Sequence, residues 1–479
     1  MLNRAKNIPV RPEPAETFFI GYVTFGGNEV RLRPPSTRYG RANCPNLTQP
    51  SEREQAPPRR AVRPASGRSP HVNDCGSIAA MWPRKRLDIG WVDVAALRAS
   101  FVFRWNRRRA AANVLAAWPA DGQTLPTMSV RSGLHLILGQ LDWPRGSEIL
   151  MSAMTIPDMA RIVRHHGFVP VPVDLDLNTA APTLESLEQA TTPLTRGLIF
   201  AHLFGTRSDM TPVLDFAKRH DIEVLEDCAQ AFTGPDWTGT PGCLASMFSF
   251  GTIKTSTALG GALVTIRDAE LANAVIREHD NWPVQRRLSF ASRFARACLM
   301  KLLAYRPMFF AFRLTLSLCR RNFDHVLNNF ARGFPGADLV PQIERRPCTP
   351  LLALMCRRLL RFDSETLARR TAIGERLRCA TRPAAALLGH QGDNHTFWVF
   401  PVLSHDPQSL ISRLRHEGFD ATQGASMEII VPPDGRADTA TTIRTAFDRI
   451  VYLPLYVSLP DKEVQRLGCV VSEQEAGSR

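Results

Sequence analysis

A carboxylate, a hydroxyl and a lysine that could act together in covalent chemistry stand within one short stretch of this chain. Asp227 ends the apolar run that begins at Ile222, Ser249 ends a second run, and Lys254 follows Ser249 closely. Small and uncharged residues surround Lys254, which favours a buried amine with a lowered pKa. Because only the neutral amine attacks an aldehyde, Lys254 is a candidate for covalent binding of a carbonyl compound.

The apolar runs before Asp227 and Ser249 read as strands, and parallel strands present their carboxyl ends at the edge where α/β proteins bind ligands. Glu226 should point to the opposite face from Asp227, because side chains alternate along a strand. A strand that ends in a carboxylate, followed by one that leads to a serine and a lysine, is the layout needed to hold pyridoxal 5'-phosphate (PLP). The carboxylate can keep the pyridine nitrogen protonated, which makes the ring an electron sink.

The segments 222–231 and 246–266 resemble the DegT/StrS-type (DegT/DnrJ/EryC/StrS) sugar aminotransferases, a branch of the fold-type I PLP enzymes. The resemblance covers roughly 128–467 and is strongest over 148–266. It implies a large α/β domain with a mostly parallel sheet of the seven-stranded type, followed by a small C-terminal α+β domain. The alternation of strand-like and helix-like segments from Met128 onward also predicts an α/β fold.

The family resemblance implies a role for each residue of the motif. Lys254 would form a Schiff base with PLP and carry the proton between the reactive carbons. Asp227 would pair with the pyridinium nitrogen, and Gln230 would reach the oxygen on the ring. Ser249 would hold the phosphate. Read without the resemblance, Asp227 could be a helix N-cap and Gln230 an exposed loop amide.

The remaining phosphate contacts of the family come from a Ser-Gly-Thr or Ser-Gly-Arg turn at a helix N-terminus, where free N–H groups and the helix dipole favour an anion. Two alignments of this chain are open. One places Ser129, Val130 and Arg131 in the turn, with Arg131 as a direct phosphate partner. The other shifts the turn to Ser132 and Gly133. Valine in the place of glycine requires a negative φ, or else the shifted alignment.

The chain departs from the family pattern at three points. Thr155 is followed by Ile156 instead of an aromatic residue, so the contact with the cofactor ring would be aliphatic. The family's Gly-Glu-Gly-Gly after the lysine is replaced by Ala258-Leu-Gly-Gly261. The Gly-Tyr-Asn-Tyr-Arg segment that reaches across the dimer in relatives has no clear match, and 333–336 stands near its place. Since that segment lines the sugar pocket in relatives, the substrate sugar stays open.

The net charge of +14 is concentrated near the N-terminus. Residues 1–110 hold 20 Lys and Arg against 8 Asp and Glu, so the other residues carry only about +2. We therefore expect no nucleic-acid partner. The ten cysteines form no CxxC pair, which argues against zinc and disulfides and fits a reducing cytoplasm. No apolar run is long enough to span a bilayer, and the N-terminus lacks the apolar core of a secretion signal.

Composition divides the chain into five predicted parts. Residues 1–80 hold 11 of the 36 prolines and an excess of arginine, which indicates a disordered tail, and a start of translation at Met81 stays open. The other expected parts are a large PLP-binding domain over 81–266, a basic apolar helical connection over 267–345, a small C-terminal domain over 346–470 and a short tail over 471–479.

Residues 286–321 contain nine Lys and Arg, no Asp or Glu, and many large apolar side chains. One interpretation, which we favour, is a helical insertion packed on the body with its arginines reaching outward. The other is an amphipathic element that lies on an anionic membrane surface. Pro307 would interrupt a long helix in either case.

The predicted function is PLP-dependent transfer of an amino group to a keto group of a nucleotide-linked sugar, in polysaccharide or glycan biosynthesis. By resemblance, glutamate is the expected amino donor and a homodimer the expected assembly. Two alternatives remain. One is a PLP-dependent sugar dehydratase, although those relatives usually carry histidine at the position of Lys254. The other is a non-catalytic regulatory protein of the same fold. The sequence leaves the sugar, the aminated carbon and the donor undetermined.

Overall fold

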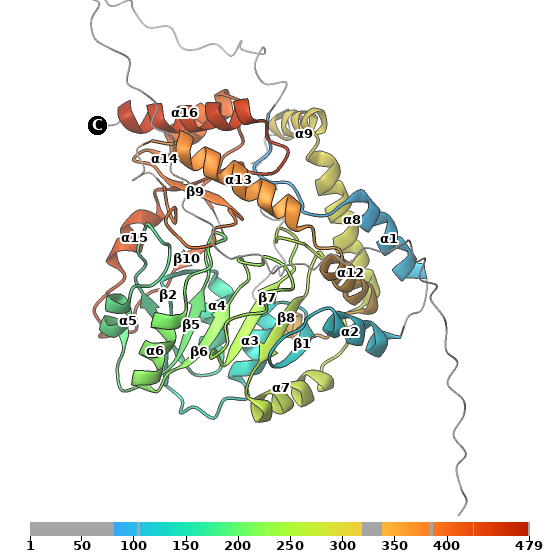
Figure 1. Cartoon of the computed structure of the whole chain (residues 1–479), viewed down its shortest axis with the longest axis vertical. Helices are drawn as coiled ribbons and strands as arrows, with labels where there is room; N and C mark the ends of the chain where they lie inside the picture. The colour runs from blue at the N-terminus through green and yellow to red at the C-terminus, as the bar shows by residue number, and fades with distance from the viewer. Residues whose placement is uncertain (1–80, 103–105, 319–337, 383–386, 425, 478–479) are drawn as a thin grey trace, which may run out of the picture. The chain divides into compact units, whose positions relative to one another are not determined.

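The computed structural model describes residues 81–102, 106–318, 338–382, 387–424 and 426–477. The predicted tail over 1–80 and the segment 333–336 lie outside these residues. Figure 1 shows the central sheet with its helices in the lower half of the view and the C-terminal helices α13, α14 and α16 in the upper half.

The large part is built on a seven-stranded sheet with the order β1-β8-β7-β6-β5-β2-β4. β8 runs antiparallel to β1 and β7, whereas the neighbouring pairs from β7 to β4 are parallel. The carboxyl ends of β1, β6 and β7 therefore meet at one edge, and the predicted α/β class is confirmed. The strands are β1 (Gln123–Thr127), β2 (Glu148–Ser152), β4 (Val169–Val173), β5 (Thr195–Ala201), β6 (Glu223–Asp227), β7 (Ala245–Ser249) and β8 (Ala262–Ile266).

Helices cover both faces of the sheet. Successive side chains of each strand point to opposite faces, so every strand contributes to the packing on both sides. On one face, Ile149 and Met151 belong to the same core as α3, α4 and α7. On the other face, Leu150 packs with α5 and α6, and Phe248 packs with α1, α2 and α12. The helices are α1 (Trp91–Val102), α2 (Arg107–Ala116), α3 (Val130–Leu138), α4 (Pro157–His165), α5 (Leu184–Ala190), α6 (Thr211–His220), α7 (Ala269–Asn281) and α12 (Thr349–Leu360).

The C-terminal part has its own core around the antiparallel pair β9 and β11. Helices α13, α14 and α16 contribute to this core, and Trp82 belongs to it as well. Because Trp82 pairs with Phe419, the first described residues join the C-terminal part and not the large sheet. The remaining elements are β3 (Met154–Thr155), β9 (Phe400–Leu403), β10 (Glu428–Ile429), β11 (Ile450–Leu453), α11 (Val340–Ile343), α13 (Ser364–Ala380), α14 (Pro407–His416), α15 (Thr441–Phe447) and α16 (Asp461–Gly477).

The end of the chain corrects the expectation of a tail over 471–479. Helix α16 continues to Gly477. Val471 is fully buried, and the buried Glu475 accepts a hydrogen bond from the Ser404 hydroxyl, with 2.6 Å between Oγ and Oε1. These tertiary contacts keep the last turns helical, and the composition of the segment gives no sign of them.

The basic apolar segment forms two helices, α8 (Arg287–Leu303) and α9 (Arg306–Leu318), with Pro307 in the first turn of α9. Helix α8 packs on the body, since Phe290 is fully buried and Lys301 Nζ donates to a backbone carbonyl oxygen at 2.6 Å. None of the helices in the described part of the chain combines the length and the apolar composition that crossing a bilayer requires.

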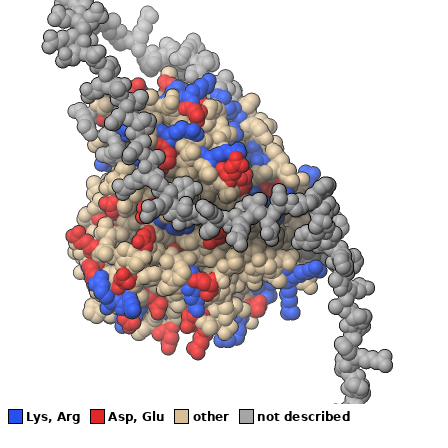
Figure 2. Space-filling view, in the orientation of Figure 1, with Lys and Arg blue, Asp and Glu red and all other residues tan. Residues whose placement is uncertain are grey.

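Basic and acidic side chains are interspersed on the surface of the described body. Figure 2 shows blue Lys and Arg side chains beside red Asp and Glu side chains over the face that it draws. Some of these side chains form salt bridges between helices. Arg357 Nε and Arg358 Nη1 on α12 contact the two carboxylate oxygens of Asp93 on α1 at 2.7 and 2.8 Å. Arginines of α12 thus contribute to packing against α1.

Candidate active site

The carboxyl edge of the sheet brings together the residues that the sequence motif predicts. β6 ends at Asp227, β7 ends at Ser249, and the two strands pair in parallel with Asp227 opposite Met247. The chain then passes through Lys254 before it enters β8. Asp227 and Lys254 lie close enough for each charge to change the pKa of the other group.

Asp227 presents a carboxylate with one unused oxygen. Its Oδ1 accepts a hydrogen bond from the Ala229 N–H at 2.9 Å, and its Oδ2 has no partner among the described residues. Burial raises the pKa of Asp227, while the positive charges of Lys254 and Arg131 lower it. A cationic N–H group close to Oδ2 could therefore donate a hydrogen bond to this carboxylate oxygen, which is poorly hydrated and has no partner among the described residues.

Lys254 carries an amine that titrates close to neutral pH. Burial lowers the pKa of Lys254 from 10.5 to about 8, with Asp227 raising it and Arg131 lowering it. Nζ lies 4.0 Å from the centroid of the Trp398 ring. The neutral amine is therefore well populated in mildly basic solution, which is the condition for attack on a carbonyl group.

The loop that carries Lys254 is fixed by contacts from several parts of the chain. The Phe250 carbonyl oxygen accepts a hydrogen bond from the Ala258 N–H at 3.0 Å. The Ser256 N–H donates to Asp88 Oδ2 at 2.6 Å, and Ser256 has a φ of 53°. Since residues with a side chain rarely adopt this left-handed backbone, the surrounding contacts impose the loop geometry.

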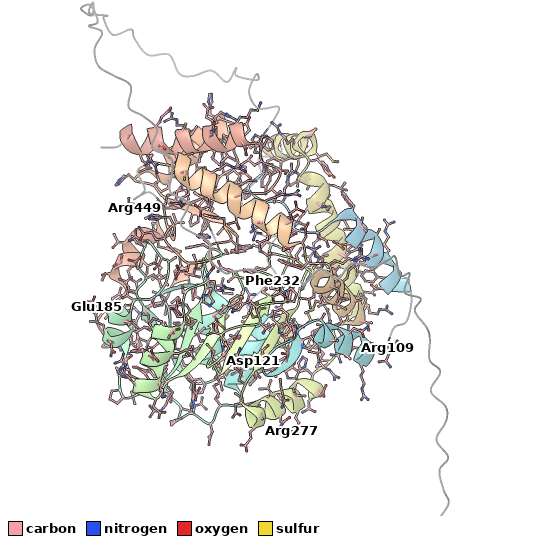
Figure 3. The ribbon with its side chains drawn as sticks, viewed as in Figure 1. Arg109, Asp121, Glu185, Phe232, Arg277 and Arg449 are labelled. Atoms are coloured by element: carbon pink, nitrogen blue, oxygen red, sulfur yellow. The ribbon has the colours of Figure 1, made fainter. Side chains whose placement is uncertain are left out.

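An aromatic cluster supports the start of this loop. Figure 3 shows Phe232 near the middle of the view, between the sheet and the C-terminal helices. The ring of Phe232 lies 5.2 Å from those of Phe250 and Phe362 in edge-on arrangements. Trp118 packs edge-on against Phe248 in the same core, with a centroid distance of 5.0 Å. Rigid packing of this kind holds the backbone before Lys254 in one position.

Gln230 and Ser249 retain hydrogen-bonding capacity that the described residues do not use. Gln230 Oε1 accepts a hydrogen bond from the Phe204 N–H at 2.9 Å, which fixes the amide and leaves its NH₂ group to donate elsewhere. Ser249 Oγ accepts a long bond of 3.4 Å from the Gly251 N–H. A Cβ at Gly251 would lie 3.5 Å from Ser249 Oγ and 3.7 Å from Lys254 Cγ, so both side chains approach the same point.

The phosphate-turn candidates lie at the start of α3. Ser129 is the N-cap, and its Oγ accepts a hydrogen bond from the Ser132 N–H at 3.2 Å. Gly133 lies inside the helix, where a Cβ would come within 2.4 Å of Val264 Cγ2 on β8. Gly133 thus permits close packing of α3 on the sheet. The first turn of α3 corresponds to the alignment with Val130 in the turn, and Val130 is not among the residues with positive φ.

Arg131 and Ser132 both have protein partners. Arg131 Nε donates to Asp158 Oδ2 at 2.6 Å, which joins the starts of α3 and α4. Ser132 Oγ donates to the Ile343 carbonyl oxygen at 2.9 Å. The charge of Arg131 still lowers the pKa of Lys254, so Arg131 supplies positive potential at this edge.

Three residues that the sequence reading missed lie around Lys254. Trp398 Nε1 donates to the Ile253 carbonyl oxygen at 3.0 Å, and both Nη atoms of Arg370 lie 3.2 Å from Thr255 Oγ1. The third is Lys85, whose Nζ lies 4.0 Å from the centroid of the Trp398 ring. These residues come from distant segments without a shared motif, so no spacing in the sequence could have identified them.

Glu226 points away from Lys254 into a largely buried network, as the strand alternation predicts. Its carboxylate accepts hydrogen bonds from His202 Nε2, the Thr240 N–H and hydroxyl, and the Ser246 hydroxyl, at 2.7 to 2.9 Å. Burial alone would raise the pKa of Glu226, but these donors lower it to about 2. Cys228 also comes near, and burial raises the pKa of its thiol well above 9.

Replacing Glu226 by glutamine is expected to lower the free energy of unfolding at pH 7 by about 2–4 kcal/mol, because the new NH₂ group would face buried donors. Urea unfolding measures this loss. The pKa of Glu226 falls from 4.5 to about 2 on folding, so its contribution is complete above pH 4.5 and disappears as the pH falls through about 2. The exposed Asp215→Asn on α6 serves as the control. Equal losses in both variants would contradict the role of the network.

The side-chain groups at this edge that lack a partner among the described residues match the functional groups of PLP. An amine with a lowered pKa could bind an aldehyde, and an unpaired carboxylate oxygen could hold a protonated ring nitrogen. A free amide NH₂ group and a serine hydroxyl remain for the other polar atoms of the ring and phosphate. The N–H groups at the start of a nine-residue helix suit an anion.

Solved structures of aminotransferases share this fold. The aminotransferase TlmJ from Streptoalloteichus hindustanus has a TM-score of 0.60 over 84% of this chain and 100% of its own, at 18% identity. PseC from Helicobacter pylori, an aminotransferase of pseudoaminic acid biosynthesis, has a TM-score of 0.60 over 83% of this chain and 100% of its own, at 13% identity. At these identities the likeness establishes the fold alone, an α/β fold with a mostly parallel seven-stranded sheet, as predicted.

The family resemblance is confirmed for the segment that holds the motif: residues 95–287 match the model of the DegT/DnrJ/EryC1/StrS aminotransferase family. A UDP-N-acetyl-3-dehydro-alpha-D-glucosamine 3-aminotransferase of Acidithiobacillus ferrooxidans is 33% identical over 193 residues, which cover 38% of this chain and 51% of that relative. A GDP-perosamine synthase of Caulobacter vibrioides is 35% identical over 144 residues, which cover 29% of this chain and 38% of the relative. The matches thus span about half or less of these curated relatives.

Proposed function

We propose that this protein is a PLP-dependent aminotransferase that transfers an amino group to a keto group of a nucleotide-linked sugar. The observation that carries the proposal is the meeting of Lys254, Asp227 and Ser249 at one edge of the sheet, within the segment matched to the aminotransferase family. The names of the curated relatives support nucleotide-linked sugars as the substrate class. Glutamate is the proposed amino donor, and polysaccharide or glycan biosynthesis is the proposed setting.

Each residue of the site has a proposed task. PLP would supply an electron-withdrawing pyridinium ring. Lys254 Nζ binds the cofactor covalently and moves the proton in the site, and Asp227 Oδ2 holds the proton on the ring nitrogen. Gln230 orients the ring through its amide nitrogen. The Ser249 hydroxyl and the turn from Ser129 to Gly133 bind the phosphate, with Arg131 supplying charge and Ser132 and Gly133 shaping the start of α3.

A screen of amino donors and keto sugars tests this function. The PLP-loaded protein is incubated with glutamate or another amino acid and with UDP- or GDP-linked keto sugars, and the products are identified by mass spectrometry. An amino sugar together with the oxo acid of the donor supports the proposal. A product that has lost water identifies the dehydratase instead. A protein without the near-visible absorbance of lysine-bound PLP fits the regulatory alternative.

The proposed assembly is a homodimer with two-fold symmetry, because sites of this fold lie at a subunit boundary and neighbouring chains complete them. Light scattering of the PLP-loaded protein should give twice the chain mass of 53.3 kDa. The interface should be on the order of 2,000 Å² or more and largely apolar. A monomer that retains turnover would refute the shared site and favour 286–321 as the replacement for the partner's contribution.

We also propose that the protein is cytoplasmic and that α8 and α9 are an insertion packed on the body, with contact to an anionic membrane surface as the alternative to test. The cysteines in the described residues are free thiols, which suits a reducing compartment. Leu288 is 84% exposed, and Leu299, Leu302 and Met308 are exposed beside basic residues. Sedimentation with phosphatidylserine vesicles, but not with phosphatidylcholine vesicles, would support the contact. Equal sedimentation with both kinds, or with neither, would refute it.

A further inference from the structure

A cavity of about 190 Å³ lies beside the candidate site. Ile253 and Trp398, which flank Lys254, form part of its wall. The other walls come from residues 83–87, from α8 and α9, and from the end of β11. Most of the lining side chains are aliphatic or aromatic, such as Leu303 on α8.

Much of this wall is built by segments outside the part of the chain that matches the aminotransferase family. Residues 83–87 precede the matched range 95–287, and α8 and α9 follow it. These segments therefore border an apolar space next to the candidate site. An apolar group that enters such a space is removed from water, which favours its binding.

Two of the polar residues in the cavity wall have clear partners in the protein, whereas a third, Lys85, has one weak contact. Arg84 pairs with Asp420 through two contacts of 2.8 and 2.9 Å. The hydroxyl of Thr422 donates to a backbone carbonyl oxygen at 2.9 Å. Lys85 Nζ has a single long bond of 3.3 Å to the Trp398 carbonyl oxygen, and no carboxylate of the described residues pairs with it.

The surroundings of Lys85 favour an anion beside it. Burial lowers the pKa of Lys85 well below 10.5, the positive charges of Lys254 and Arg370 lower it further, and the carboxylate of Asp88 raises it in part. A negative group at Nζ would compensate these charges and restore the ammonium form. The cavity thus combines an apolar wall with one amine that forms no ion pair within contact distance among the described residues.

We propose that this cavity binds an aliphatic chain of about six to eight carbons whose anionic end group contacts Lys85. An apolar cavity of about 150 Å³ accommodates benzene, so the present volume suits a chain of this size. This binding needs neither PLP nor a sugar and goes beyond the proposed transamination. Fatty acids and lipid phosphates are two sources of such a ligand.

Calorimetric titration of the full chain with octanoate, octyl phosphate and octanol tests the proposal. We expect one site that binds at least one of the two anions about ten-fold more tightly than octanol, and the stronger anion identifies the source. Lys85→Met should abolish the preference for the anion and keep the binding of octanol. Leu303→Trp should fill the cavity and remove the binding of all three ligands. Leu288→Trp, on the exposed side of the same helix, should leave the binding unchanged.

Several results would overturn the proposal. These are the absence of a one-to-one site, equal binding of octanol and both anions, and binding that survives Leu303→Trp. Circular dichroism checks that each variant folds, and Met300→Phe provides a second way to fill the cavity if Leu303→Trp does not. Since the readout is ligand binding, the result does not depend on whether the aminotransferase proposal holds.

Discussion

Replacing Lys254 by alanine is expected to abolish covalent binding of PLP and to lower turnover by about three orders of magnitude or more. The reason is that Lys254 is the amine placed beside Asp227 and Ser249 at the sheet edge, with a pKa of about 8. The wild-type protein with PLP should absorb in the near-visible range, and borohydride should fix the cofactor on Lys254. Peptide mapping by mass spectrometry locates the label.

The control for this experiment is Lys218→Ala, which removes an exposed lysine from α6 and should leave the absorbance and turnover unchanged. The rate of PLP binding should rise with pH through about 8, because the neutral amine reacts. A label on Lys85, the other amine that lies against Trp398, would show that the assignment of Lys254 is wrong.

Replacing Asp227 by asparagine is expected to reduce turnover by about two to four orders of magnitude while PLP still binds. The substitution keeps the shape of the side chain but removes the charge that holds the ring nitrogen protonated. It also removes the negative charge that raises the pKa of Lys254, so the pH midpoint for PLP binding should move below about 8.

Steady-state kinetics and absorbance titrations measure these two effects of Asp227→Asn. Glu223→Gln is the matched control, because Glu223 is exposed at the opposite end of the same strand and should not alter either quantity. Turnover close to wild type in Asp227→Asn would show that Asp227 does not have the proposed role of holding the proton on the ring nitrogen. A drop of the same size in Glu223→Gln would point to damage of the strand instead.

The sequence predicted the parts of this protein that depend on local pattern. The alternation of strands and helices gave the α/β class, and the period of two along β6 separated Glu226 from Asp227. The order of Asp227, Ser249 and Lys254 placed three polar groups after two adjacent strands, because parallel strands end at one edge. These inferences hold because they rest on neighbours in the chain.

Contacts between distant segments were decided by the tertiary structure. The placement of Gly133 inside α3 depends on Val264 of β8, and the helical end of α16 depends on the contact between Glu475 and Ser404. The chain by itself therefore indicated which residues are candidates for the chemistry. The packing of remote segments decided the charge environment of Lys254, its contact with Trp398 and the cavity beside it, because burial and Coulomb interactions depend on distance in space and not in sequence.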